Sequence, residues 1–240
     1  MRSLFISDLH LSDARPEANE KFISFVEGQA QGAQALYILG DLFEYWIGDD
    51  DLAEPFNAMV AGFFTALGRS GVQLRLMHGN RDFLIGERFC AVTGAQLLED
   101  PCVIDLDGEK TLLMHGDTLC TDDLEYQAWR RTARSAEFQR EFLAKPLAER
   151  RHAVGAMREK SKAVIQAKPA EIMDVNEAAV REALRRHGVR RLIHGHTHRA
   201  GRHQLDVDGR PCERWVLPDW YAGGGYLEVA AGAPRLVRWK

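Results

Sequence analysis

The chain has 240 residues, of which 45% are hydrophobic and 28% are charged, and its formal net charge at pH 7 is −4. These values are ordinary for a soluble globular protein and argue against a disordered chain. The four cysteines form no CxxC pair, which argues against a zinc ribbon and gives no support to a disulfide framework. The charge-free stretch 55–68 is too short to span a bilayer, and no charged and then apolar leader precedes the first strand, so we expect a reduced, cytosolic compartment.

The first part of the chain alternates strand patterns with helix patterns. Apolar runs of strand-forming residues end at residues 7, 39 and 77, and amphipathic helix patterns at 17–29 and 56–67 separate them. This alternation predicts an α/β fold. Three consecutive aspartates at residues 49–51 follow an aromatic segment, and we interpret them as a solvated helix start or loop.

Shorter elements follow. The turn dipeptide at Asp107 and Gly108 predicts a hairpin between strands at 102–106 and 110–114. A helix at 174–187 is expected to end at Gly188, a typical cap residue. The other predicted elements are a short helix at 85–92 and strands at 96–98, 189–193, 202–207, 213–217, 226–230 and 235–239.

Residues 122–168 differ in character from the rest of the chain. Strand patterns vanish there, glycine nearly disappears, and apolar residues follow helical spacing. We predict a helical insertion at residues 122–170 within a single domain that comprises residues 1–240. Residues 128–168 hold eleven Lys or Arg and four Glu, a local charge of +7.

Five strand-like segments each end in polar side chains that can bind a metal ion. Binding groups gather beyond the carboxyl ends of strands in α/β sheets, so these side chains could converge on one crevice. Carboxylate oxygens and imidazole nitrogens suit divalent ions. Two ions that share Asp41 as a bridge would each have four protein ligands and could activate water toward a phosphoryl group. The candidates are Asp8, His10, Asp41, Asn80, His115, His196 and His198.

Each of these signals is weak alone. A single histidine at a strand end is more often structural, and a Gly-Asp or Gly-Asn pair is usually a turn. We assign His78, His152, His187 and His203 to structural roles, whereas His194 could orient a neighbouring ligand. A structural role for all the candidate ligands would require five coincidences.

The motifs Asp-x-His, Gly-Asp, Gly-Asn, His-Gly-Asp and Gly-His-x-His occur in this order over residues 8–198. This order resembles the calcineurin-like metallophosphoesterases. The resemblance implies a two-sheet β-sandwich core flanked by helices (αββα), here with a helical insertion. It implies that one metal is held by Asp8, His10, Asp41 and His198, and the other by Asp41, Asn80, His115 and His196.

Arg81 follows the Gly-Asn motif, where that family usually has a histidine. A guanidinium offers charge and a planar fork but scarcely a proton, so general-acid help from this position is in doubt. Together with the segments 37–51, 78–83, 115–123 and 172–176, Arg81 makes the chain resemble the UDP-2,3-diacylglucosamine hydrolases of lipid A biosynthesis. The resemblance implies cleavage of the pyrophosphate of UDP-2,3-diacylglucosamine to UMP and 2,3-diacylglucosamine 1-phosphate (lipid X), with two Mn²⁺ ions.

The same resemblance implies catalytic roles for Asp41, Asn80 and Arg81. Ile165 stands at a contact position where a small polar residue is usual, and its side chain offers no hydrogen bond there. The implied substrate contacts are Asn80, Arg81, Asp123, Tyr126, Arg158, Ser161, Ile165, Lys168 and His196.

The basic residues of the insertion are opposite in sign to the rest of the chain, which favours an anionic membrane surface and anionic substrates. Apolar residues among them could hold acyl chains, although packing against the core is the commoner role for most. These apolar residues are Phe138, Phe142, Leu143, Leu147, Val154, Met157, Val164 and Ile165.

We therefore expect a peripheral enzyme on the cytoplasmic face of the inner membrane, with UDP-2,3-diacylglucosamine as its substrate. Nucleic acid is not expected, because no motif supports specific binding, and no obligate protein partner is inferred. Two alternatives stay open. The chain could act on another phosphodiester or nucleotide pyrophosphate, or it could be a non-catalytic scaffold that keeps the fold.

Overall fold

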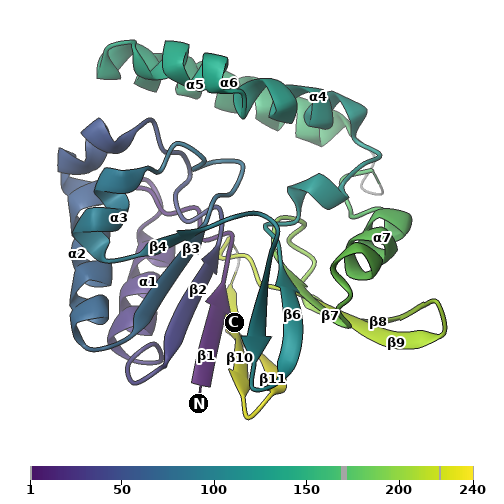
Figure 1. Cartoon of the computed structure of the whole chain (residues 1–240). Helices are drawn as coiled ribbons and strands as arrows, with labels where there is room; N and C mark the ends of the chain where they lie inside the picture. Colours follow the sequence, from purple (N-terminus) through teal and green to yellow (C-terminus); the bar gives the residue numbers. More distant parts are fainter. Residues whose placement is uncertain (1, 169–171, 222, 240) are drawn as a thin grey trace.

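The computed structural model describes residues 2–168, 172–221 and 223–239, and for residues 159–167 it describes the backbone alone. Two β-sheets pack face to face, and helices cover their outer faces (Figure 1). The strands are β1 (Arg2–Ile6), β2 (Ala35–Leu39), β3 (Gln73–Met77), β4 (Gln96–Leu98), β5 (Cys102–Leu106), β6 (Glu109–Leu113), β7 (Arg191–His194), β8 (Gly201–Val207), β9 (Arg210–Val216), β10 (Gly224–Ala230) and β11 (Ala233–Trp239). The helices are α1 (Pro16–Glu27), α2 (Pro55–Arg69), α3 (Glu87–Thr93), α4 (Leu124–Ala133), α5 (Ala136–Leu143), α6 (Leu147–Ala167) and α7 (Glu177–His187), with short 3-10 helices η1 (Asp49–Ala53) and η2 (Asp117–Leu119).

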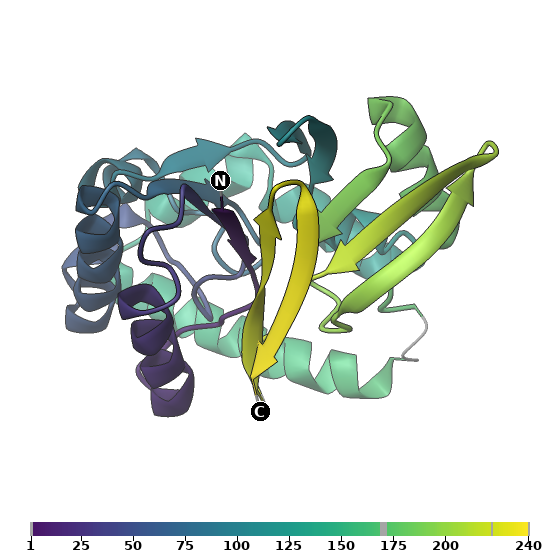
Figure 2. The ribbon, with the colours of Figure 1, turned by 90° about the horizontal axis from the view of Figure 1, so that it is seen from below.

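The first sheet has the strand order β11-β10-β1-β2-β3-β4. Strands β1 to β4 are parallel, and the hairpin of β10 and β11 joins them antiparallel to β1 (Figure 2). The second sheet has the order β5-β6-β7-β9-β8, in which β6, β7 and β9 are parallel and the two edge strands are antiparallel to their neighbours. The carboxyl ends of the parallel strands thus lie together at one edge of each sheet.

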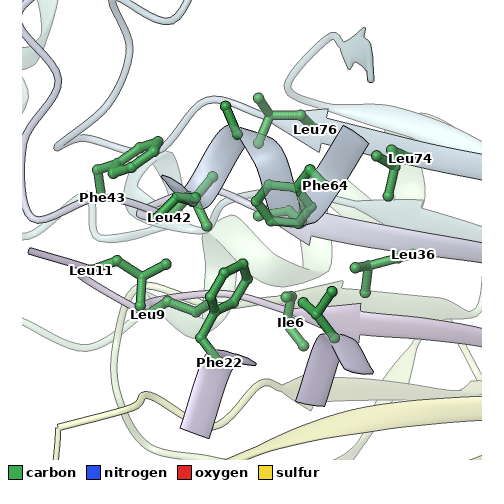
Figure 3. Close-up of a cluster of buried hydrophobic side chains, with 14 of the residues drawn as sticks. Ile6, Leu9, Leu11, Phe22, Leu36, Leu42, Phe43, Phe64, Leu74 and Leu76 are labelled. Atoms are coloured by element: carbon green, nitrogen blue, oxygen red, sulfur yellow. The ribbon is translucent and has the colours of Figure 1, made fainter. Parts of the chain in front are cut away.

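Successive strand residues face different apolar layers, because side chains alternate across a sheet. In β1, Leu4 and Ile6 join the layer beneath α1 and α2, where Phe22 and Phe64 also pack (Figure 3). Phe5 lies between the two sheets with apolar side chains from both of them. Strand β1 is therefore buried on both faces, as its continuous apolar run predicts.

The second sheet repeats this alternation. Leu112 and Leu192 pack against Leu184 of α7, whereas the next residue of each strand, Leu113 and Ile193, lies in the layer between the sheets. The layers therefore run helices, sheet, sheet, helix. This order confirms the predicted α/β class and the αββα sandwich.

Local sequence signals set several element ends. Glu54 caps α2 by accepting hydrogen bonds from the backbone amides of Phe56 and Asn57. Gly188 ends α7 with a φ of 64°, in the left-handed region that a glycine adopts without strain. The β5–β6 register pairs Leu106 with Glu109, which confirms the predicted hairpin turn between them.

Helices α4, α5 and α6 form a layer above the edge where the strands end (Figure 1). Two aspartates of η1 anchor α6, because Arg150 pairs with Asp50 and Arg151 pairs with Asp51. Arg150 is only 2% exposed and also donates a hydrogen bond to the carbonyl oxygen of Ile47. That residues 122–170 form an insertion within a single domain stays a prediction.

Residues 49–51 do form a helix start, the first turn of η1, and Asp50 is exposed, but Asp51 is buried and Asp49 half-buried, so the run is only partly solvated. Besides the two pairs with α6, Asp49 accepts hydrogen bonds from the Trp46 indole and from the backbone amides of Gly86 and Phe89. The run therefore holds α6 on one side and the start of α3 on the other. Each of the three carboxylates thus has a partner far away in sequence that a local pattern does not show.

The apolar side chains of the insertion divide into three groups. Phe142 is buried in the main core, and Phe138, Leu147 and Val154 are partly buried against it, so packing is their role. Leu143 and Met157 remain about two-fifths exposed, at 41% and 39%. The side chains of Val164 and Ile165 lie outside the described residues.

Candidate functional site

The side chains predicted to bind metal follow β1, β2, β3, β6 and β7 and meet at one edge of the sandwich. Backbone hydrogen bonds continue beyond the first two strands: the amide of Asp8 donates to the carbonyl of Gly40, and the amide of His10 donates to the carbonyl of Asp41. The two loops therefore run side by side past the end of the sheet. This pairing fixes the spacing between Asp8, His10 and Asp41.

Most of the candidate ligands have an unusual backbone conformation. Their φ angles lie between 49° and 66°, in the left-handed region. For a residue other than glycine, this backbone conformation costs on the order of 1 to 3 kcal/mol. The surrounding hydrogen bonds must hold this conformation in place. The residues concerned are Asp8, His10, Asp41, His196 and His198.

Two glycines allow the loops to approach closely. A Cβ atom at Gly79 would lie 2.1 Å from an Asp41 carboxylate oxygen, and one at Gly195 would lie 2.3 Å from Asp8 Oδ2. No other residue type fits at these distances. The glycines of the Gly-Asn and Gly-His motifs are thus part of how the site is assembled.

Asp8, His10 and His198 form the first cluster of donors, with Asp41 at its edge. Asp8 Oδ1 lies 3.4 Å from His198 Nε2 and 4.0 Å from His10 Nε2. His10 Nε2 lies 3.7 Å from Asp41 Oδ2. Candidate ligand atoms of Asp8, His10 and His198 all lie within 4.8 Å of one another, as three ligands of one ion would.

A second cluster lies on the other side of Asp41. Asp41 Oδ1 lies 3.9 Å from His115 Nε2, which is 3.0 Å from Asn80 Oδ1. His196 Nδ1 is 2.9 Å from the same Asn80 oxygen. The carboxylate of Asp41 therefore presents one oxygen to each cluster, which is the geometry of a bridging ligand.

The site concentrates buried charge. Burial raises the pKa of Asp41 to about 7, with the His115 charge opposing and the Asp82 and Asp8 carboxylates reinforcing the shift. Burial disfavours a charged His115, but the Asp41, Asp117 and Asp8 carboxylates outweigh it and raise the pKa of His115 to about 9. Carboxylates this close together favour any cation that can enter between them.

The donor atoms also fit divalent ions. Asp8 Oδ1 and His10 Nε2 are buried and have no hydrogen-bond partner among the described residues. Buried polar atoms are rarely left without a partner, so such atoms indicate a ligand. Oxygen and imidazole donors together suit ions such as manganese, magnesium or zinc.

Asp82 holds the two central loops together, a role that sequence reasoning missed. It is fully buried, and its carboxylate accepts hydrogen bonds from the amides of Gly79 at 2.8 Å, Leu42 at 2.7 Å and Asp41 at 3.3 Å. It also lies 3.4 Å from the amide of Phe43. Its place two residues after Asn80 in the motif is the one signal that could have identified it.

Asp117 connects helix α4 to the site. Its buried carboxylate accepts hydrogen bonds from the Tyr126 hydroxyl at 2.8 Å and from Arg130 Nε at 2.7 Å. The ring of Tyr126 packs 5.7 Å, centroid to centroid, from that of His196. Tyr126, one of the predicted substrate contacts, is therefore at the edge of the second cluster.

The other predicted substrate contacts have different surroundings. The backbone amide of Arg81 donates to Asp41 Oδ1 at 2.8 Å, which places this residue beside the Asp41 carboxylate. Arg158 pairs with Glu44 at 3.0 Å. Asp123 and Lys168 pair with each other at 2.8 Å.

Asp123 also accepts a hydrogen bond from the amide of Tyr126 and so caps helix α4. Its pairing with Lys168 joins the start of α4 to the chain just after α6. The side chains of Ser161 and Ile165 lie outside the described residues. Their predicted contacts therefore stay predictions.

Among the described residues, the hydrogen-bond partners of His194 do not include a candidate ligand side chain. Its Nδ1 is 2.8 Å from the carbonyl oxygen of Gly195, and its Nε2 is 3.2 Å from Arg214 Nη1. Burial, with the Arg214 charge beside it, lowers the pKa of His194 to about 3. A neutral His194 therefore braces the loop that carries His196.

A family model described as calcineurin-like phosphoesterase matches residues 1–200. The chain belongs to this family. The fold and the resemblance expected from the sequence are confirmed, and the chain is a metal-dependent hydrolase.

Relatives with nearly the same length share about half of the sequence. A protein of Aromatoleum aromaticum is 50% identical over 99% of this chain and 97% of its own length. Proteins of Aliivibrio fischeri and Pseudomonas aeruginosa are 49% and 48% identical, over 96% and 98% of this chain and 95% and 98% of their own lengths. All three are named UDP-2,3-diacylglucosamine hydrolase.

Proposed function

We propose that this chain hydrolyses the pyrophosphate bond of UDP-2,3-diacylglucosamine to UMP and 2,3-diacylglucosamine 1-phosphate (lipid X) in lipid A biosynthesis. The observation that carries the chemistry is the Asp41 carboxylate, with Oδ2 facing one donor cluster and Oδ1 facing the other. The names of relatives that share about half of the sequence over nearly the whole chain support the substrate.

Two Mn²⁺ ions would occupy the two clusters. Asp8, His10, Asp41 and His198 would hold the first, and Asp41, Asn80, His115 and His196 would hold the second. When bound, such a pair of ions activates water and neutralises charge on a phosphoryl group. The buried setting of both aspartates, Asp8 and Asp41, keeps their charges strong, because little water screens them.

Arg81 supplies fixed positive charge beside the reaction centre. Its backbone is held at both ends, since its amide donates to Asp41 and its carbonyl oxygen accepts from the amide of Trp46. A guanidinium stays protonated, so it can stabilise negative charge that develops on the pyrophosphate but does not donate a proton. Asn80 would position the substrate from the second cluster.

The layer of α4 to α6 would hold the diacylglucosamine end of the substrate. Tyr126 and Arg158 lie on the side of the layer that approaches the donor clusters, next to His196 and Glu44. Asp123, Ser161, Ile165 and Lys168 would contact the sugar, the amides or a phosphate. Exposed Leu143 and Met157 are apolar surface that acyl chains could cover.

We also propose peripheral binding to the cytoplasmic face of the inner membrane. Arg131, Arg140 and Lys145 form no ion pairs with described residues and so leave positive charge for anionic lipid headgroups. Leu124 and Trp129 add exposed apolar surface, at 76% and 44%. In the described parts of the chain, no helix is both long and apolar enough to cross a bilayer.

Incubation of purified protein with UDP-2,3-diacylglucosamine and Mn²⁺ tests the proposal. We expect UMP and the diacylated sugar phosphate in equal amounts, detected by mass spectrometry, and no release after EDTA treatment. Release of UDP, or no product, would refute the assigned reaction. Equal turnover of the deacylated analogue would show instead that the site serves a soluble nucleotide pyrophosphate.

A further inference from the structure

Glu44 is a buried carboxylate beside the first donor cluster, and its exposed fraction is 6%. It follows the loop that carries Asp41, and its backbone amide donates to the carbonyl of Leu11, next to His10. A buried glutamate is rare unless its charge has partners. Three side chains from separate parts of the sequence provide them.

One partner is His10. Glu44 Oε2 lies 3.5 Å from His10 Nδ1, while His10 Nε2 faces the carboxylates of Asp8 and Asp41. An imidazole that binds a metal through one nitrogen usually presents the other to a carboxylate, which fixes the ring orientation and its tautomer. The arrangement of Glu44, His10 and the first cluster matches this pattern.

The second partner is Arg158 of helix α6. Its Nη2 lies 3.0 Å from Glu44 Oε1, the oxygen that does not face His10. The same guanidinium lies 5.4 Å from the ring centroid of Tyr45, at cation–π distance. The two oxygens of Glu44 thus contact the first cluster and the helical layer above it.

Tyr221 is the third partner. Its hydroxyl donates to Glu44 Oε2 at 3.2 Å, and its ring packs against the rings of His10 and His198 at 4.9 and 5.5 Å between centroids. The hydroxyl therefore bonds the same Glu44 oxygen that faces the His10 imidazole. This leaves the carboxylate little freedom to turn away from His10.

We propose that Glu44 is a positioning residue that orients His10 for metal binding and anchors helix α6 beside the same site. The inference rests on the proposed metal role of His10. Through Glu44, the orientation of a metal ligand and the position of α6 depend on each other. The contact that anchors α6 would therefore also keep the His10 ring in the orientation that binds the ion.

Glu44→Gln tests both parts of this role, because it keeps the size of the side chain and removes its charge. Loss of such a carboxylate partner typically weakens metal binding by about 10- to 100-fold. We expect one Mn²⁺ site to weaken by this amount in a titration followed by electron paramagnetic resonance. Activity should fall at limiting Mn²⁺ and rise again with excess Mn²⁺, and the amides of α6 should exchange hydrogen faster.

Two further variants separate the contact to α6 from the contact to His10. Arg158→Met removes only the contact to α6, so it should speed exchange in α6 and, through Glu44, weaken Mn²⁺ binding by less than Glu44→Gln does. Glu44→Asp keeps the charge and should restore part of the Mn²⁺ affinity, including in the case that Glu44→Gln folds poorly. Glu228→Gln is the matched control, because this glutamate pairs with Arg235 at 2.9 Å on the distant hairpin, and it should change neither readout.

Wild-type Mn²⁺ affinity in Glu44→Gln, or unchanged exchange in α6, would overturn the inference while leaving the proposed reaction intact. Failure of the wild-type protein to bind Mn²⁺ would overturn both. The wild-type titration therefore separates an error about Glu44 from an error about the site as a whole.

Discussion

Replacement of Asp41 by alanine is expected to lower kcat by about 10³-fold or more, equal to about 4 kcal/mol of transition-state stabilisation. The reason is geometric. The substitution removes both oxygens that face the clusters, Oδ2 at 3.7 Å from His10 Nε2 and Oδ1 at 3.9 Å from His115 Nε2. UMP release by purified protein in excess Mn²⁺ measures the effect, and circular dichroism checks that the variant is folded.

Asp107→Ala is a matched control for this experiment. Asp107 has a φ of 54° and Asp41 a φ of 53°, so alanine meets the same left-handed backbone at both positions. Asp107 lies in the β5–β6 turn, at the opposite end of β6 from His115. Asp107→Ala should therefore keep full activity, and wild-type turnover by Asp41→Ala would contradict the bridging role.

Asp82→Ala is expected to lower the free energy of unfolding by about 3 kcal/mol or more, because buried amide donors left without an acceptor cost about 1 to 3 kcal/mol each. Three amides donate to this carboxylate within 3.3 Å. Urea unfolding in the absence of metal measures the loss. Activity should fall as well, since the loops that carry Asp41 and Asn80 would no longer be held together.

Asp82→Asn is the comparison that isolates the hydrogen bonds. It keeps the side-chain volume and one accepting oxygen, so it should lose clearly less stability than alanine at the same position. Equal losses in the two variants would mean that packing, and not the pairing of the amides, explains the effect. A change below about 0.5 kcal/mol in Asp82→Ala, the range usual for surface positions, would contradict the structural role.

The candidate ligands could be predicted from the sequence because each follows a strand. An apolar run with a polar residue at its end is a local pattern, and parallel strands bring their carboxyl ends to one edge whatever their spacing along the chain. Asp8 and Asn80 could be placed together in this way although 72 positions separate them. Strand ends predicted to within a few residues were accurate enough to place these side chains at the same edge.

Residues that act through long-range pairs could not be predicted. The aspartates at 49–51 are one example, since their partners Arg150 and Arg151 lie about a hundred positions later. Glu44 is another, because a glutamate in an aromatic loop gives no local sign of burial or of contact with His10. In both cases tertiary packing supplies the partners of a charge, and a local pattern does not show them.

The predicted substrate contacts depended on resemblance alone. The structure brings Tyr126 close to His196, but it pairs Asp123 with Lys168 and Arg158 with Glu44. Substrate would have to share or exchange these pairs. No sequence pattern carries that information, because it depends on how α4 and α6 lie over the strand ends.

The number of Mn²⁺ ions bound per chain tests the central claim most directly. Equilibrium dialysis of the wild-type protein against Mn²⁺, with metal and protein measured in the same samples, should reach two ions per chain. The same measurement on Asp41→Ala should show weakened binding at both sites, because each loses one ligand. Saturation at a single ion per chain in a fully active wild-type enzyme would contradict the two-metal site.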